Sequence, residues 1–260
     1  FDGTNDYLYK SSLTDYRSSD TVGSIVTWFK GDDPGPNYNS LFCYADTAGS
    51  ANYFWLYVLA DATIRFQPVH ADAGGQITST VATTENAWNC VALTYDDSDY
   101  KIYINGTESP INNGLAGGVT RWFNDLGSGV YDQLTIGALI RNTSQHYHGG
   151  QISQTGVWNT TLTAAQILAI NDLGPGGNWK TDYSSGLVDY WTMGNQIGEG
   201  TDDTSTIYSQ VTGGQDLTVA GSMAAPFAGH TITATGTSMT HSTTKSVFGG
   251  SSISFDGTND

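Results

Sequence analysis

The side chains of this 260-residue chain that could perform acid–base chemistry are mostly aspartates. Only three glutamates occur, and they are far apart in the sequence: Glu85, Glu108 and Glu199. Retaining glycoside hydrolysis needs two carboxyl groups about 5–5.5 Å apart. The sequence also shows no Ser-His-Asp arrangement, Gly-rich phosphate loop or cysteine spacing for zinc. We therefore predict that the chain is not an enzyme and does not hydrolyse polysaccharides.

Aromatic side chains suggest binding instead. In the segment 52–59, side chains alternate between two faces, as in a strand, so that Tyr53, Trp55 and Tyr57 share the face opposite Phe54, Leu56 and Val58. If the second set packs in a core, the first forms a row of rings that could stack on sugars. Trp122, in an expected rim loop, is a second candidate for carbohydrate binding. The alternative is that a neighbouring repeat, or the segment 176–254, covers the row.

Carboxylates in expected turns are candidate calcium ligands, because calcium prefers oxygen donors. The candidate metal ligands are Asp2, Asp6, Asp96, Asp97, Asp99 and Asn105. No twelve-residue calcium loop is present, so such a site would have to be assembled from distant turns. His146 and His148 are a further pair that could ligate a metal. Turn formation alone also accounts for these aspartates.

The elements that must position these residues are short strands bounded by Gly, Asp, Asn or Ser. We expect strands at 24–30, 39–44, 52–59, 63–68, 76–81, 88–95, 100–105, 134–140, 151–158 and 187–193. One helix is expected near 163–172, because hydroxyl residues precede an apolar stripe that Gly174 and Pro175 terminate. This pattern predicts an all-β, antiparallel jelly-roll sandwich with one short helix.

Composition limits the partners. Nine basic against 25 acidic residues give a net charge of -16, which argues against nucleic acid and anionic membranes. No apolar run approaches 18 residues, so we expect no membrane insertion. The abundance of Gly, Ser and Thr favours an extracellular, cell-surface or virion-surface location. Cys43 and Cys90 are expected as buried small hydrophobes, with a disulfide between them as the alternative.

The two ends of the sequence repeat each other. The hexapeptide FDGTND occupies residues 1–6 and again residues 255–260. Such a repeat indicates an array, and we expect the chain, which does not start with Met, to be a fragment or processed product. The predicted organisation is a jelly-roll core at 1–175 and a connecting segment at 176–260, whose end (245–260) begins the next repeat. Neighbouring copies would be partners, either as separate subunits or within one polypeptide.

Three stretches resemble the laminin-G-like, concanavalin-A-like lectin/glucanase superfamily. They are FDGTNDYL at 1–8, residues 88–95 followed by KIYING at 101–106, and 150–158 followed by LTAAQI at 162–167. Residues 187–194 and 248–257 resemble what precedes the first of these stretches. The resemblance implies a jelly roll, tandem repetition as in bacterial surface adhesins and phage structural proteins, and possible calcium binding. Ser153 and Gln154 stand where the family often has acidic residues, which weakens a calcium or catalytic role there.

Three functions follow as hypotheses. The first is an extracellular structural repeat of a fibre, filament or long adhesin, joined head to tail. The alternative is a carbohydrate-binding adhesin module, with glycans as partners, and the least favoured is a glycoside-active enzyme. The structural and binding hypotheses differ on whether the face with Tyr53, Trp55 and Tyr57 is open or covered.

Overall fold

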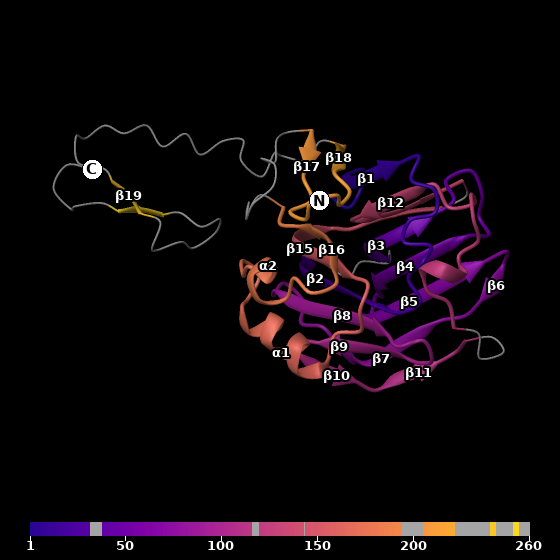
Figure 1. The fold of residues 1–260 in the computed structure, drawn as a ribbon, viewed down its shortest axis with the longest axis horizontal. Helices are drawn as coiled ribbons and strands as arrows, with labels where there is room; N and C mark the ends of the chain where they lie inside the picture. Colours follow the sequence, from indigo (N-terminus) through magenta and orange to yellow (C-terminus); the bar gives the residue numbers. More distant parts are fainter. Residues whose placement is uncertain are drawn as a thin grey trace.

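Two antiparallel sheets pack face to face in this structure, a computed structural model (Figure 1). It describes residues 1–31, 38–115, 120–142, 144–193, 205–221, 240–242 and 252–254. The larger sheet has the order β11–β7–β5–β4–β3–β12–β1–β18–β17, with β6 paired to β5. Its strands are β1 (Tyr7–Ser11), β3 (Asn39–Ala45), β4 (Tyr53–Val58), β5 (Thr63–His70), β6 (Ala73–Gly74), β7 (Ile77–Ala82), β11 (Ile111–Asn113), β12 (Gln133–Ile136), β17 (Thr206–Ile207) and β18 (Leu217–Ala220).

The second sheet has six strands in the order β10–β9–β8–β2–β15–β16. They are β2 (Gly23–Gly31), β8 (Asn89–Tyr95), β9 (Tyr100–Ile104), β10 (Thr107–Ser109), β15 (Gly150–Trp158) and β16 (Leu187–Trp191). Two hairpins form sheets of their own: β13 (Ala138–Arg141) with β14 (Ser144–Tyr147), and β19 (Thr240–Ser242) with β20 (Ser252–Ser254). The predicted all-β antiparallel sandwich is confirmed.

The main core lies between the two sheets and follows the expected alternation. Phe54, Leu56 and Val58 of β4 point into it, as the sequence predicts. The second sheet is also covered on its outer face, where Val26 and Trp28 of β2 pack against Ile167. Strand β2 therefore reads as a nearly continuous buried run rather than an alternating one.

The predicted helix is α1 (Ala164–Asp172), which covers the outer face of the second sheet beside α2 (Trp179–Asp182) (Figure 1). Thr163 caps it, since its side chain accepts from the backbone N–H of Gln166, whose own side chain accepts from the N–H of Thr163. Past the helix end, Gly174 has a φ of +73°, a conformation that glycine adopts without strain. No helix in the described part of the chain is long and apolar enough to cross a membrane.

The segment after residue 175 belongs to the sandwich, which corrects the expected boundary. Strand β16 pairs with β15 and β18 pairs with β1, so one segment extends both sheets. Trp179, Tyr190 and Trp191 are fully buried, and the Trp191 indole N–H donates to the carbonyl of Gln215 at 2.7 Å. The prediction of a connecting segment from residue 176 was wrong for the described parts of 176–221. The apolar residues scattered through this polar stretch are buried in the two hydrophobic cores of the sandwich. Most of 245–260 lies outside the described residues.

Cys43 and Cys90 are buried and unbonded, as the preferred interpretation predicted. Cys43 lies in β3 of the larger sheet and Cys90 in β8 of the second sheet, and they pack in different clusters. Burial raises the pKa of both thiols, so neither is a reactive thiolate.

Candidate functional site

The predicted row of aromatic rings exists, but most of it is covered. Trp55 and Tyr57 stack on each other with ring centroids 3.6 Å apart, and the ring of His146 stacks on Trp55 at 5.2 Å. Leu139 belongs to the same cluster, and the ring of Tyr38 packs edge-on against both Trp55 and Tyr57. The cover is therefore the β13–β14 hairpin together with Tyr38 of the same chain. With exposed fractions of 3% and 2%, Trp55 and Tyr57 cannot stack on a sugar, and their assignment to carbohydrate binding was wrong.

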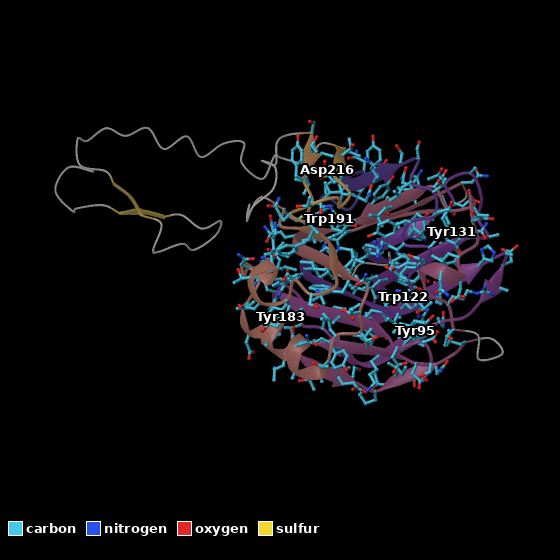
Figure 2. All side chains as sticks on the ribbon, viewed as in Figure 1. Tyr95, Trp122, Tyr131, Tyr183, Trp191 and Asp216 are labelled. Carbon is cyan, nitrogen blue, oxygen red and sulfur yellow. The ribbon has the colours of Figure 1, made fainter. Side chains whose placement is uncertain are left out.

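Trp122 is likewise a core residue. Its side chain is 0% exposed and lies between the sheets, against Phe54, Tyr95 and Phe123 (Figure 2). The segment that carries it, expected as a rim loop, turns inward here and forms a short 3-10 helix at Phe123–Asp125. The second predicted carbohydrate-binding aromatic is therefore also corrected, because burial in the core excludes contact with a ligand.

Tyr53 is the one predicted aromatic that borders an open surface. It is partly exposed, and the Arg141 guanidinium lies over its ring, 4.4 Å from the centroid. Nη1 of Arg141 donates to the carbonyl of Ser50 at 2.7 Å. Both contacts hold the guanidinium at the rim of an open depression lined also by Gln67 and Gln76. Tyr53 therefore keeps its place as a candidate binding residue.

Hydrogen bonds order the polar side chains across the outer face of β4, β5 and β7. The Tyr57 hydroxyl donates to Gln67 Oε1 at 2.7 Å, and Gln67 Nε2 donates to Gln76 Oε1 at 3.1 Å. On the same face, Nε of Arg65 donates to Thr78 Oγ1 at 2.9 Å. Arg65 and Thr78 both line a second depression. We call this surface the open face; its residues are Tyr53, Arg65, Gln67, Gln76, Thr78 and Arg141.

The open face combines donors and acceptors held in fixed positions, which suits a ligand with many hydroxyl groups. Of its residues the sequence identified only Tyr53. Arg65 and Gln67 could have been predicted to lie on the outer face, because they alternate with the apolar Ile64 and Phe66 along β5. Nothing in the sequence indicated Arg141, since only the tertiary fold packs β13 against β3 and brings Arg141 over the Tyr53 ring.

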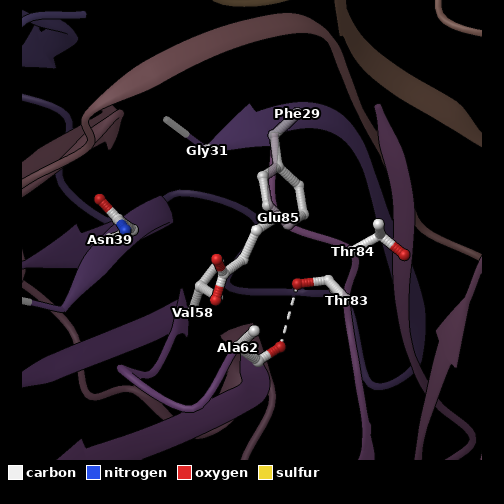
Figure 3. Close-up of a pocket in the computed structure, with 8 residues that line it drawn as sticks. All are labelled: Phe29, Gly31, Asn39, Val58, Ala62, Thr83, Thr84 and Glu85. Carbon is white, nitrogen blue, oxygen red and sulfur yellow. Dashed lines mark hydrogen bonds between the residues drawn. The ribbon is translucent and has the colours of Figure 1, made fainter. Parts of the chain in front are cut away.

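A separate small pocket cannot hold a sugar. It lies between the ends of strands of both sheets, as Figure 3 shows, and is lined by Phe29, Gly31, Asn39, Val58, Ala62, Thr83, Thr84 and Glu85. Its volume of about 20 Å³ has room for about one water molecule and not for a sugar ring. The other described glutamate, Glu108, bonds to Lys101 and to the Tyr103 hydroxyl, both at 3.3 Å. Glu199 lies outside the described residues.

The predicted calcium ligands serve the turns that contain them. Oδ1 of Asp2 accepts from the backbone N–H groups of Thr4, Asn5 and Asp6, and hydrogen bonds to backbone N–H groups hold the pKa of Asp2 below its usual value. Oδ2 of Asp6 accepts from the N–H of Asp2.

The same holds for the second predicted group of ligands. Oδ1 of Asp96 accepts from the backbone of Ser98 and Asp99, and Asn105 Oδ1 accepts from the N–H of Cys90. Asp97 is exposed in the same turn, with a φ of +77°. No three acidic, His or Cys side chains meet as a metal site in the described part of the chain. Calcium binding by the predicted residues stays a prediction.

His146 and His148 lie in different environments and do not form a pair. His146 packs on Trp55, whereas His148 is fully buried with its ring against Phe1 and Phe29. Burial lowers the pKa of His148 to about 3, so the ring is neutral at physiological pH.

A buried acid near one end of the sandwich gives a testable pH dependence. Asp189 accepts from the Tyr16 hydroxyl at 2.8 Å and from the N–H of Gln215, yet burial raises its pKa to about 6. Because the folded state binds this proton more tightly than the unfolded state, its stabilising contribution is present below pH 4 and is lost as the pH rises towards 6.

We expect Asp189→Asn to remove the decrease in stability that the ionisation of Asp189 causes between pH 4 and pH 6. The unfolding free energy of the variant relative to the parent should rise by on the order of 2–3 kcal/mol between pH 4 and pH 7. Urea unfolding at several pH values measures it, and the parent–variant difference cancels the opposite contribution of His148. A difference that is constant with pH would contradict the assignment.

Comparisons with known proteins agree with this fold. A family model described as the concanavalin A-like lectin/glucanases superfamily matches residues 2–168. The CBM40 of Ruminococcus gnavus IT-sialidase is 20% identical, with a TM-score of 0.53 over 65% of this chain and 92% of that one. The same module in complex with α2,3-sialyllactose is 18% identical, with a TM-score of 0.51 over 66% of this chain and 97% of that one. A candidate carbohydrate-binding protein of Bacteroides ovatus is 16% identical, with a TM-score of 0.52 over 84% of this chain and 58% of that one. No curated protein matches. At these identities the structures establish similarity of fold.

Proposed function

Because the chain belongs to the concanavalin A-like lectin/glucanase superfamily, we propose that it is a carbohydrate-binding module that holds glycans on its open face. The observation that carries this proposal is the depression in which Tyr53 and Arg141 meet Gln67 and Gln76. Similar folds include carbohydrate-binding modules, which supports the binding hypothesis over the structural-repeat hypothesis.

The chemistry of the open face favours hydrogen bonding over broad stacking. Arg141 already covers one face of the Tyr53 ring, so a sugar meets the edge of that ring and the guanidinium. The amides of Gln67 and Gln76 supply further donors and acceptors for hydroxyl groups. A guanidinium pairs well with a carboxylate, so we propose that glycans carrying an acidic sugar bind more tightly than neutral ones.

We expect Arg141→Ala to weaken binding of sialyllactose by about tenfold to a hundredfold, because a charge-assisted hydrogen bond is worth about 1.5–3 kcal/mol. Tyr53→Ala should weaken binding of both sialyllactose and lactose. Isothermal titration calorimetry with the two glycans measures both effects.

The matched control is Lys101→Ala, which removes one exposed positive charge from the other sheet. It should leave glycan affinity unchanged. Normal affinity in both Arg141→Ala and Tyr53→Ala would place the glycan elsewhere or exclude glycan binding. Equal loss for lactose and sialyllactose in Arg141→Ala would remove the acidic-sugar preference and keep the site.

We further propose that the module is not catalytic and works outside the cell, where glycans are displayed. Glu85 and Glu108 lie away from the open face: Glu85 lines the small pocket of Figure 3, and Glu108 pairs with Lys101 on the second sheet. Calcium has no role in this proposal, because its predicted ligands bond to their own turns.

A further inference from the structure

The open face carries two depressions that adjoin each other. They lie over β4, β5, β7 and β11, which are neighbours in the larger sheet (Figure 1). The first depression, at Tyr53 and Arg141, has a volume of about 460 Å³, and the second, at Arg65, has a volume of about 490 Å³. Gln76 and Gly114 line both of them. Sites for small ligands have volumes of about 300–1,000 Å³, so the two depressions together offer room for a chain of sugars.

The second depression is built from paired residues of three neighbouring strands. Arg65 of β5 is opposite Thr78 of β7, and Thr78 is opposite Asn112 of β11. Residues opposite each other share a face, so these three side chains form a row across the sheet. All three line the depression, together with Thr63 and Thr80. The depression therefore offers guanidinium, amide and hydroxyl groups, which form hydrogen bonds with sugars.

Arg65 is held in position and still has donors for a ligand. Its Nε donates to Thr78 Oγ1 at 2.9 Å, and the guanidinium has further N–H donors. Arg65 forms no ion pair in the described part of the chain, whereas Arg17 and Lys101 each pair with a carboxylate. A guanidinium pairs well with a carboxylate. Arg65 thus offers a second position for an acidic sugar, besides the position proposed at Arg141.

The two arginines are too far apart for one sugar ring. Arg141 lies over Tyr53, and Tyr53 is opposite Val69 of β5. Val69 is four residues along the strand from Arg65. At about 3.3 Å per residue, the strand positions beneath the two guanidinium groups are about 13 Å apart. A single sugar cannot reach both guanidinium groups, whereas a chain of sugars can.

The charged groups along β5 limit where acidic sugars can lie. Asp61 precedes the strand and lines the second depression, and Asp72 follows the strand and lines the first. Arg65 and the Arg141 guanidinium lie between these two carboxylates, with the amide of Gln67 in the middle. Anionic groups are therefore repelled at both ends of the open face and attracted at two positions between the ends.

Building on the glycan-binding function proposed above, we propose that the open face binds one linear glycan in which acidic sugars recur. One carboxylate of the glycan lies at Arg141 and a second at Arg65, and hydroxyl groups between them bond to Gln67 and Gln76. The net charge of -16 repels anions at long range, so affinity for an acidic glycan depends on these local contacts. It therefore depends on whether one ligand reaches both arginines.

Isothermal titration calorimetry with oligogalacturonates of two lengths tests this proposal. Hexagalacturonate should bind one to one and about tenfold or more tightly than digalacturonate, because it gains a second charge-assisted contact. Maltohexaose, a neutral chain of the same length, should show no such gain over maltose. Oligosialic acids of matching lengths distinguish uronic from sialic acids as the source of the carboxylates. A gain with length in either acidic series supports the proposal.

The variant Arg65→Gln separates the two positions. It removes the charge and keeps a polar side chain beside Thr78, and circular dichroism checks that it folds. We expect it to bind the longer acidic chain about tenfold more weakly and to bind sialyllactose as the parent does, because sialyllactose lies at Arg141. The matched control Lys101→Gln removes one positive charge from the second sheet and should change neither affinity.

The outcomes distinguish this inference from the proposed function. Equal affinity for short and long acidic chains, or two long chains bound per protein, would overturn the inference and leave binding at Arg141 intact. The inference would also be wrong if Arg65→Gln binds the longer chain normally, or loses sialyllactose binding to the same extent. Failure of sialyllactose and of every acidic oligosaccharide to bind would instead overturn the proposed function, and the inference with it.

Discussion

A chain ending at residue 175 should fail to fold cooperatively, whereas one ending at residue 221 should fold like the parent. The segment 176–221 supplies six fully or nearly fully buried side chains to the two cores: Trp179, Leu187, Tyr190, Trp191, Ile207 and Leu217. Burial of a large apolar side chain contributes about 1.5–3 kcal/mol, so their loss removes on the order of 10 kcal/mol. This is comparable to the whole stability of a typical domain, about 5–15 kcal/mol.

Truncation also removes partners of groups that remain. The Tyr16 hydroxyl loses Asp189, and the Trp158 indole N–H loses the carbonyl of Tyr183 at 2.8 Å. Near-UV circular dichroism and urea unfolding of both truncated chains measure the effect. If the 1–175 chain unfolds cooperatively at the same urea concentration as the parent, residues 176–221 are not needed for folding and the domain ends near residue 175.

Replacing Trp122 by Ala should lower the unfolding free energy by about 3–5 kcal/mol. The Trp122 ring is fully buried between the two sheets. Its centroid lies 5.3 Å from the ring centroid of Phe54 in the larger sheet and 5.7 Å from that of Tyr95 in the second sheet. Its removal would leave a cavity that neither rigid sheet can close. Chemical denaturation measures the loss, and glycan affinity of the folded protein should stay unchanged.

The matched comparison is Tyr53→Ala on the open face. It should cost much less stability, because Tyr53 is partly exposed, and should weaken glycan binding instead. If Trp122→Ala instead keeps its stability and loses glycan binding, Trp122 contacts the glycan and its assignment to the core is wrong.

The sequence by itself determined the elements of the sandwich. Alternation in β4 and β5 set which residues face the core, and Thr163 with Gln166 set the start of α1, because these are local properties of a strand and a helix N-terminus. The repeat of FDGTND is also a property of the sequence alone.

Only the tertiary structure decided which surfaces are open. Trp55 and Tyr57 alternate as residues of an outer face should, but the β13–β14 hairpin, far along the sequence, and the ring of Tyr38 cover them. The same hairpin brings Arg141 over Tyr53 and so forms the candidate site. Periodicity reports which face of a strand a side chain occupies, whereas exposure depends on what the rest of the chain places over that face.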